Sequence, residues 1–428
     1  MQHLDFNSKI RWARKRFIAM AATYFLGVFN DNFFKQAVLL LAVEAGMNRI
    51  QGEATQLFSL PFILFSAWGG WFADRFAKRR VVIGAKILEL VAMMFGAYGI
   101  ISMSWSCIMA MVFVMALQST LFGPALNGAI PELYPPEYVT RANAILKVVT
   151  TVAILAGMAM AGFALDQRWV ATRIPFGRLL VAIIVVAIAV FGLALSFGVF
   201  SMPASGSKKP FPWTGPLDSV RDMLLLKNDP LLLLAICCQG LFYFLSLLAI
   251  LVINTLGVQE LGLSLTATSL ISVSLMAGVC AGSMAAARLT SYNRWTHVLA
   301  PALAGLGLSL TGAGLLVFTC GKGVFIFLTG VIMCAGFFGG LFLIPVTSFI
   351  QIRPASDSKG RIIGVNNFFG FTCMLISGWL FPIIDRLFRP SVCMIILGVI
   401  SCIAGLLITW ILPSCIEKTG GTLKSVSG

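Results

Sequence analysis

Residues 231–256 have the sequence LLLLAICCQGLFYFLSLLAILVINTL, which contains no charged side chain. An α-helix rises about 1.5 Å per residue, so roughly 20 apolar residues cross the hydrocarbon core of a bilayer. We therefore predict a transmembrane helix here. Similar apolar stretches occur along the whole chain, and they predict twelve spans at about 17–43, 55–73, 81–103, 107–130, 142–165, 177–200, 231–256, 266–287, 297–319, 323–350, 362–384 and 391–412.

The composition supports a membrane protein. Of the 428 residues, 59% are hydrophobic and only 11% are charged, whereas a soluble chain carries about a quarter charged residues to cover its surface. The net charge of +15 does not indicate a nucleic-acid partner, because the basic residues are scattered among apolar runs. The two His and the lack of a Cys-x-x-Cys pair argue against a metal site, and we expect no cofactor.

A polar break divides the predicted spans into six and six. The expected parts are a cytoplasmic N-terminus (1–16), an N-terminal six-helix bundle (17–200), a cytoplasmic linker (201–230), a C-terminal six-helix bundle (231–412) and a cytoplasmic tail (413–428). The fold class that follows is an all-α membrane protein of two pseudo-symmetric bundles, related by an axis along the membrane normal.

The linker and the basic residues indicate how the chain lies in the membrane. Leu217, Val220 and Leu224 recur at helical spacing after Pro216, which predicts a short helix in the membrane interface; a plain polar linker is the alternative. Lys and Arg are concentrated on the side of the two termini and the linker. By the positive-inside rule, both termini are expected in the cytoplasm.

Ionisable residues lie deep inside the predicted spans of the first half. Asp31 and Lys35 share a face of the first span, and Lys86 and Glu89 share a face of the third. A charge at the centre of a span costs about 2.5–3.5 kcal/mol, so it needs a function or a partner. We predict a polar transport cavity here. Two simpler interpretations stay open: Lys86 and Lys147 could snorkel to the cytoplasmic surface, and Asp31–Lys35 could be a structural ion pair.

The second half differs, because between residues 231 and 350 the charged residues fall only at span ends or in loops. This asymmetry favours an amphipathic substrate, whose polar head would lie on the first bundle and whose tail would lie along the second. The residues expected to line the cavity are Asn30, Asp31, Asn32, Lys35, Lys86, Glu89, Asn127, Asn143, Lys147, Gln239, Asn366 and Asn367.

The loop after the second span, GWFADRFAKRR at 70–80, resembles the GxxxDRxGRR loop of the major facilitator superfamily, with Ala77 in place of the usual Gly. Its Asp can accept hydrogen bonds from the N-terminus of a neighbouring helix, and its Arg side chains can pair with a carboxylate. We predict a cytoplasmic gate that opens when the bundles rock; a plain topogenic basic loop is the alternative. The gate residues are Gly70, Asp74, Arg75, Lys78, Arg79, Glu132 and Arg141.

The segment GVFNDNFFKQ at 27–36 resembles the N-D-N signature of the lysophospholipid transporter family, which comprises stand-alone flippases and transporters fused to acyltransferase/acyl-ACP synthetase enzymes. Lys86-x-x-Glu89, FGPA at 122–125, PEL at 131–133 and RANA at 141–144 are similar to later motifs of that family, in order and spacing. The resemblance is clear over about residues 20–150.

This resemblance implies a flippase that moves lysophosphatidylethanolamine and lysophosphatidylglycerol from the outer to the inner leaflet of a bacterial inner membrane for reacylation. It implies a role for Asp31 in the polar cavity and a functional link to a cytoplasmic acyltransferase/acyl-ACP synthetase. We expect a monomer. The chain departs from the family's pattern at Leu126, where a Lys is usual, and at 240–253, which contains no cation.

Two questions stay open at this point. Asp31 or Glu89 could carry a proton or a sodium ion, although a lipid that moves down its own gradient needs neither. The alternative function is export of a drug or another small amphiphile on the same fold. We do not expect an intramembrane enzyme, because the sequence has no Ser–His or metal constellation at a suitable depth.

Overall fold

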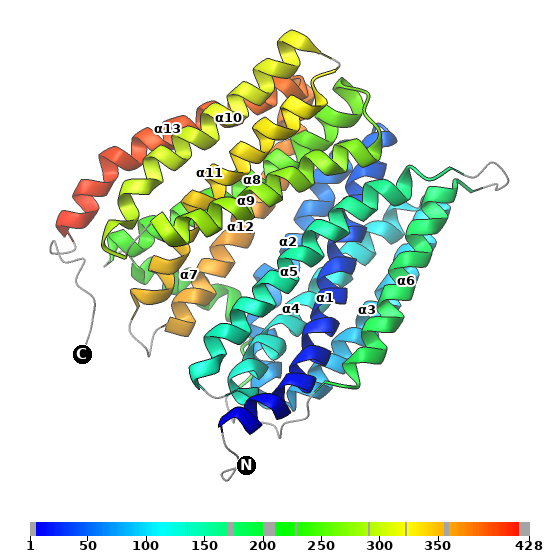
Figure 1. The fold of residues 1–428 in the computed structure, drawn as a ribbon, viewed down its shortest axis with the longest axis vertical. Helices are drawn as coiled ribbons and strands as arrows, with labels where there is room; N and C mark the ends of the chain where they lie inside the picture. The colour runs from blue at the N-terminus through cyan, green and yellow to red at the C-terminus, as the bar shows by residue number, and fades with distance from the viewer. Residues whose placement is uncertain are drawn as a thin grey trace. The chain divides into compact units, whose positions relative to one another are not determined.

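The computed structural model describes residues 6–134, 136–168, 174–199, 210–226, 229–289, 292–321, 323–354 and 359–418. Every regular element in these ranges is a helix (Figure 1). The helices before the linker are α1 (Phe6–Glu44), α2 (Arg49–Arg75), α3 (Lys78–Ser102), α4 (Trp105–Leu133), α5 (Pro136–Leu165) and α6 (Phe176–Ser196). After the linker helix α7 (Gly215–Leu225) come α8 (Pro230–Thr255), η2 (Leu256–Glu260), α9 (Leu265–Leu289), η3 (Tyr292–Val298), α10 (Leu299–Cys320), α11 (Phe325–Ile352), α12 (Lys359–Leu387) and α13 (Pro390–Lys418).

Most of the long helices have the length and composition of membrane spans. Among the described residues, ten helices are long and apolar enough to cross a bilayer. The other two long helices, α1 and α2, have 39 and 27 residues, which also exceeds the roughly 20 residues a span needs. The expected all-α fold with two sets of six long helices is confirmed for the part of the chain that the structure describes.

The chain divides into two compact units. The first contains Met1–Val38 and Leu60–Gly215, and the second contains Leu39–Ser59 and Pro216–Gly428. The segment Leu39–Ser59, here called the hairpin tip, joins α1 to α2 and groups with the second unit rather than with the first.

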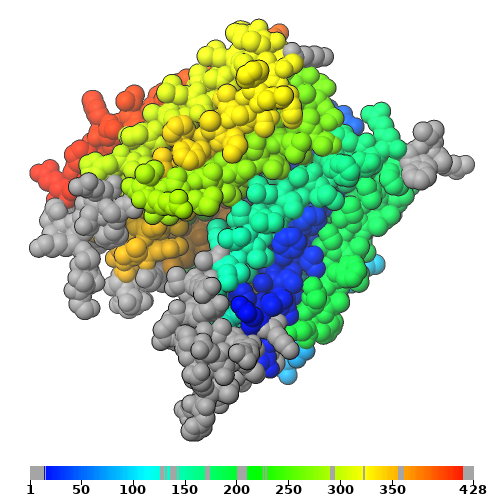
Figure 2. Space-filling model, viewed as in Figure 1, coloured from blue at the N-terminus to red at the C-terminus, as the bar shows by residue number. Residues whose placement is uncertain are grey.

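Helix α1 is the central element of the first unit's visible face. In Figure 2 it lies between α5 and α6, and small residues allow this close packing. A Cβ atom at Gly157 of α5 would lie only 2.6 Å from the carbonyl oxygen of Phe29. Gly192 of α6 faces Leu26 and the side chain of Lys86. The middle of α1 therefore packs closely against α5 and α6.

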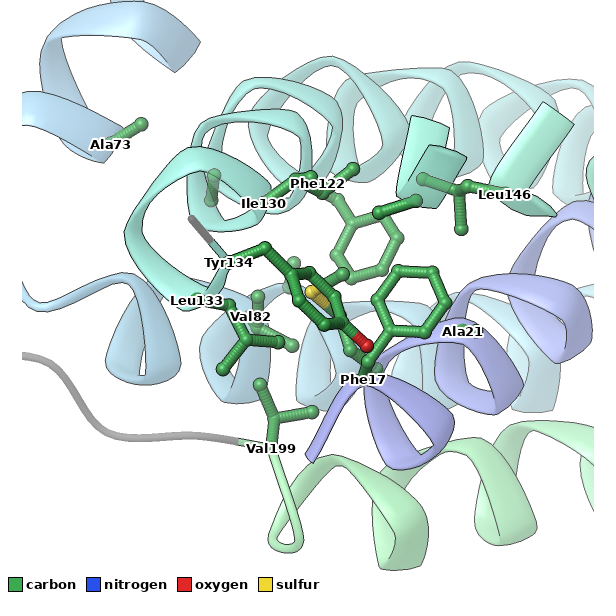
Figure 3. Packing of buried hydrophobic residues seen from close by; sticks show 14 residues of the cluster. Phe17, Ala21, Ala73, Val82, Phe122, Ile130, Leu133, Tyr134, Leu146 and Val199 are labelled. Atoms are coloured by element: carbon green, nitrogen blue, oxygen red, sulfur yellow. The ribbon is translucent and has the colours of Figure 1, made fainter. Parts of the chain in front are cut away.

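An apolar cluster closes one end of the first unit (Figure 3). The rings of Phe17 and Tyr134 meet edge to face, with centroids 5.4 Å apart, and Val82 and Val199 are buried in the same cluster. These residues join α1, α3, the end of α4 and the chain after α6. Ala73 also belongs to the cluster, so the predicted gate loop begins directly beside it.

Small residues set the closest helix contact in the second unit. Gly278 and Gly282 of α9 lie against the backbone of α11, and Gly336 and Gly340 of α11 lie against the backbone of α9. A Cβ atom at Gly282 would overlap the carbonyl oxygen of Phe337, at 1.8 Å. This agrees with the small-xxx-small spacing of these glycines, which lets two helices approach at backbone distance.

The hairpin tip packs into the second unit in the same way. Gly52 lies against Gly378 and Pro382 of α12, and a Cβ atom at Gly378 would lie 2.7 Å from the carbonyl oxygen of Gly52. Because both contacts involve backbone atoms, larger side chains at Gly52 or Gly378 would push the tip off α12.

The linker is anchored by aromatic residues before α7 begins. The rings of Phe211 and Trp213 pack on Trp68 of α2, with centroids 5.2 and 6.4 Å away, and the indole of Trp68 donates to the Pro212 carbonyl oxygen. In α7 the side chains of Leu217 and Leu224 are exposed. The expected linker helix is present, with its apolar side chains outward as an interfacial helix requires.

Candidate functional site

The polar middle of α1 contains the most distinctive side chains of the first unit. Asp31 is half-buried and accepts hydrogen bonds from two residues of α4: Ser119 Oγ at 2.6 Å and Gln118 Nε2 at 3.4 Å. Lys35, also half-buried, interacts electrostatically with Asp31 from one turn along the same helix. Asn32 is half-buried and bonds back to the Val28 carbonyl oxygen.

Sequence reasoning missed the α4 partners of Asp31. The available signal was a run of three consecutive polar residues, Gln118, Ser119 and Thr120, in a largely apolar span. Polar groups inside a span normally face a partner in the bundle. The structure identifies Asp31 as the partner of Gln118 and Ser119, whereas Thr120 bonds back to the Ala116 carbonyl oxygen of its own helix.

Lys86 and Glu89 form a sealed ion pair on α3. The Lys86 ammonium lies 2.5 Å from a Glu89 carboxylate oxygen, and the two side chains are 1% and 0% exposed. Asn30 of α1 donates to Glu89 at 3.4 Å and to the Val185 carbonyl oxygen of α6 at 3.1 Å. The pair therefore ties α3 to α1 and, through Asn30, to α6.

The surroundings of Lys86 explain why it stays inside. Its ammonium lies 5.1 Å from the centre of the Phe122 ring, which adds a cation–π contact to the ion pair. Gly27 gives it room, because a Cβ atom there would lie 2.6 Å from the ammonium nitrogen. The alternative that Lys86 snorkels to the surface is wrong in this structure. Lys86 and Glu89 line no accessible surface here, whereas Asp31, Asn32 and Lys35 are partly accessible.

The remaining candidates of the first unit lie on α5 and α4. The side chains of Asn143 and Lys147 are exposed on α5. The side chain of Asn127 lies outside what the structure describes. The half-buried set that the structure brings together is therefore confined to α1 and α4.

Along α8 and α11, the second unit offers neutral polar groups in place of charges. Gln239 of α8 is buried, accepts a hydrogen bond from Thr347 of α11 at 3.2 Å and donates to the Tyr243 hydroxyl at 3.5 Å. Asn366 of α12 is buried, and its Oδ1 has no hydrogen-bond partner among the described residues. Asn367 is exposed. Thr347 and Tyr243 join this set from the structure and were not among the predicted site residues.

The predicted gate loop lies at the junction of α2 and α3. Arg79 donates to the carbonyl oxygen of Phe197 at 2.7 Å, at the C-terminal end of α6, where the helix dipole favours a cation. The guanidinium of Arg75 lies 5.5 Å from the Trp71 ring centre. Asp74 is exposed and Lys78 is half-buried. Gly70 has open space at its Cα, so packing does not require a glycine there.

Two gate residues have side chains outside the described part of the chain: Glu132 and Arg141. Their pairing with the loop stays a prediction. The structure instead shows that Arg79 binds a helix end, so the basic loop has at least one structural contact within its own unit.

A second polar cluster, here called the tip cluster, was not predicted. Asn48 of the hairpin tip donates to Gln259 Oε1 and to Asp385 Oδ2, both at 2.9 Å, and Gln259 Nε2 donates back to Asn48 Oδ1 at 2.7 Å. Asn254 donates to Gln51 Oε1 at 3.0 Å. These hydrogen bonds fasten the tip to the ends of α8 and α12 within the second unit.

Comparison with known proteins identifies the family to which this fold belongs. A family model described as Major Facilitator Superfamily matches residues 17–378. The chain belongs to the Major Facilitator Superfamily. It is accordingly a multi-pass membrane transporter and not an enzyme.

Among superfamily members, relatives named lysophospholipid transporter LplT match over most of the chain. The one from Klebsiella pneumoniae subsp. pneumoniae is 26% identical over 381 residues, covering 85% of this chain and 87% of the relative. The one from Yersinia enterocolitica is 25% identical over 382 residues, covering 88% of each chain. The sequence resemblance to lysophospholipid transporters is thus confirmed well beyond the first 150 residues.

Solved structures of the superfamily share the fold. A D-xylose-proton symporter superposes with a TM-score of 0.71 at 14% identity, covering 92% of this chain and 96% of that one. A point mutant of the nucleoside transporter NupG superposes with a TM-score of 0.69 at 11% identity, covering 91% of this chain and 99% of that one. At such identities the likeness concerns the fold alone.

Proposed function

We propose that this protein is a lysophospholipid flippase that moves lysophosphatidylethanolamine and lysophosphatidylglycerol from the outer to the inner leaflet of a bacterial inner membrane by alternating access. The names of its relatives support the substrate class. The observation that carries the proposal is the half-buried Asp31, held by Ser119 and Gln118, in a unit whose counterpart has only neutral polar groups along α8 and α11.

The headgroup is bound by the accessible charges of α1. Asp31 presents a carboxylate and Lys35 an ammonium one helical turn apart, so a zwitterionic headgroup meets an opposite charge for each of its own. A lysophosphatidylglycerol headgroup uses Lys35 through its phosphate. The single acyl chain lies along apolar helices of the second unit such as α8 and α11, which contain no charged residue.

The sealed Lys86–Glu89 pair is a positioning element in this proposal. It binds Asn30, the residue directly before Asp31, and so fixes the rotation of α1 about its axis. The substrate does not touch the pair. This assigns two of the predicted cavity residues a structural role and keeps Asp31 and Lys35 as the substrate contacts.

Two sets of contacts act as gates. The tip cluster closes the side of the membrane on which the α1–α2 hairpin lies, and it must separate when that side opens. The 70–80 loop serves the opposite, cytoplasmic side, together with Glu132 and Arg141. Both termini are cytoplasmic in this proposal, because that side carries most of the Lys and Arg.

Transport is completed by acylation of the lipid on the cytoplasmic side by an acyltransferase/acyl-ACP synthetase. This reaction removes the product from the inner leaflet and makes net inward movement favourable. Binding of H⁺ or Na⁺ at Asp31 also favours net inward movement of the lipid when there is a gradient of that ion across the membrane.

The test uses proteoliposomes with fluorescent lysophosphatidylethanolamine added to the outer leaflet. The fraction that becomes protected from extraction by albumin reports inward movement. We expect the protein to accelerate this movement over empty vesicles. Asp31→Asn should slow it about ten-fold, because a charged hydrogen-bond acceptor is lost.

The matched control is Glu44→Gln, which removes an exposed carboxylate at the end of the same helix and should leave transport unchanged. If lipid movement equals that of empty vesicles while the same vesicles transport a cationic dye, the protein is an exporter of small amphiphiles instead. If Asp31→Asn transports lipid at the full rate, Asp31 is only a structural residue.

A further inference from the structure

A groove of about 1030 Å³ runs between α10 and α13 in the second unit. Small residues form part of its lining: Ala300 and Ala304 on α10, and Gly405 on α13. A Cβ atom at Gly405 would lie 3.3 Å from the Ala300 carbonyl oxygen, so the two helices are close at this point. Leu308 and Leu406 of the same lining are 69% and 68% exposed. Figure 2 shows the end of α13 at the surface of the molecule.

One end of the groove is polar. Thr296, His297 and Glu417 line it, where α10 begins and α13 ends. The side chains of His297 and Glu417 are exposed, and Thr296 is mostly buried. The remainder of the lining consists of apolar residues, apart from Thr409 and Cys402. The groove therefore has the amphipathic pattern of a lipid: polar at one end and apolar along its length.

The length of the groove matches one leaflet. Its lining on α13 extends from Glu417 back to Cys402, which is about 22 Å along a helix. Half of a bilayer that is about 40–45 Å thick, headgroups included, spans a similar distance. With Glu417 at the headgroup level, the other end of the groove reaches the middle of the membrane.

We propose that this groove binds one resident two-chain phospholipid of the ethanolamine class, from the leaflet on which the C-terminal end of α13 lies. The lipid ammonium pairs with the Glu417 carboxylate, and its phosphate oxygens accept hydrogen bonds from the Thr296 hydroxyl and the His297 imidazole. One acyl chain lies in the groove over Ala304 and Gly405. An anionic glycerol headgroup is disfavoured, because it brings a phosphate beside Glu417 without an ammonium group to offset it.

This site is separate from the transport site. None of the predicted cavity residues lines the groove, and its polar end is built from the start of α10 and the end of α13. The proposed lipid site therefore does not depend on which substrate the protein transports.

The experiment uses the full-length protein in nanodiscs that contain a phosphatidylethanolamine with a photoreactive diazirine in its acyl chain. After irradiation, the labelled peptides are identified by mass spectrometry. We expect labels to concentrate on peptides containing residues 296–308 and 402–417. Excess unlabelled phosphatidylethanolamine should reduce this labelling, and the same amount of phosphatidylglycerol should reduce it about five-fold less effectively.

Two variants test the two halves of the site. Glu417→Gln removes an exposed charge without disturbing packing, and it should abolish the preference between the two headgroups. Ala304→Leu fills the groove and should reduce labelling with either lipid, while Leu407→Phe, on α13 outside the lining, should not. The thermal unfolding temperature of each variant identifies any that does not fold.

Three results would overturn the proposal. Equal competition by the two lipids would mean that the groove is ordinary lipid-facing surface. Labels spread evenly over the outer helices would mean the same. Displacement by lysophosphatidylethanolamine at far lower concentration than by the two-chain lipid would mean that the occupant is a single-chain lipid, not a resident phospholipid.

Discussion

Glycine contacts join helices in both units, as Gly157 of α5 does against the backbone of Phe29, but the first unit also joins helices through buried charges. In the first unit, α1, α3 and α6 meet around an ion pair, Lys86–Glu89, and the amide of Asn30. In the second unit, α9 and α11 meet backbone to backbone through glycines such as Gly282 and Gly340. The first arrangement is directional and depends on charge, whereas the second depends only on the absence of side chains.

This difference shows which unit can hold a side chain in a defined orientation. A buried ion pair gives little net stability, because the cost of removing two charges from water offsets their attraction. What it does give is a defined rotation of α1, since hydrogen bonds have preferred directions. Glycine contacts allow close approach but impose no such constraint. The unit with the charges is therefore the one suited to holding Asp31 in a fixed position.

The largest loss of stability is expected when only one partner of the Lys86–Glu89 ion pair is removed. Lys86→Met leaves the Glu89 carboxylate buried without its counter-ion, which costs about 3–5 kcal/mol. We expect a large fall in the thermal unfolding temperature of the purified protein. The double variant Lys86→Met/Glu89→Met removes both charges and should recover most of this loss, but with reduced lipid transport, because Asn30 loses its link to α3 and keeps only its bond to the Val185 carbonyl oxygen.

Lys147→Met is the control for this experiment, since Lys147 is exposed on α5. Its stability should change little. If Lys86→Met were as stable as the wild type, the ion pair would not be what joins α3 to α1, and the contrast with the second unit would disappear.

The next largest loss of stability is expected at the glycine contact between α9 and α11. Gly282→Ala places a methyl group against the Phe337 carbonyl oxygen, and such overpacking costs about 1–3 kcal/mol. Gly330→Ala on α11, where a Cβ atom meets nothing within 4 Å, should be neutral or stabilising. Thermal unfolding of both variants measures the difference. Equal stability would show that α9 and α11 separate without cost.

A smaller effect is expected in the tip cluster. Asn48→Ala removes two exposed hydrogen bonds with Gln259 and one with Asp385, and we expect a total net cost of about 1 kcal/mol, because exposed polar groups regain hydrogen bonds to water. This should make the hairpin side of the membrane more accessible. Labelling of a cysteine introduced at the buried Ile50, whose side chain makes no hydrogen bond in the cluster, with a membrane-impermeant maleimide reports that accessibility. No increase over the same cysteine in an otherwise unchanged chain would argue against a gate at this position.

The smallest effect should come from the neutral polar pair of the second unit. Thr347→Val removes one hydrogen bond to Gln239 and keeps the side-chain shape, so we expect a loss of about 1 kcal/mol or less. Lipid transport should stay within about two-fold of the wild type. A transport loss as large as that of Asp31→Asn would show that the headgroup also contacts the second unit.

Part of the site was accessible from the sequence. Asp31, Lys35, Lys86 and Glu89 stand out because charges are rare within spans, and their spacing shows which of them share a helix face. The sequence also contains the glycine pairs of α9 and α11. It does not show which charges are sealed, because burial depends on helices far away in the chain: Lys86 is covered by Gly27 and Gly192 of α1 and α6.

The hydrogen-bond partners that lie on different helices could not be predicted from the sequence either. Ser119 meets Asp31 across 88 positions of sequence, and Asn48 meets Asp385 across 337. A one-turn spacing predicts neighbours along one helix, but no local pattern predicts which helices touch. This is why the α4 partners of Asp31 and the whole tip cluster came from the structure.

The amino-acid sequence determined that the chain is a bundle of membrane helices with charges in its first half, because hydropathy and helical periodicity act over short stretches and can be followed residue by residue. Only the tertiary structure decided which of those charges are accessible and which are sealed, where the hairpin tip binds, and that α10 and α13 leave a groove between them. Burial and long-range hydrogen bonds depend on the packing of helices that are distant in sequence, and local patterns contain no information about that packing.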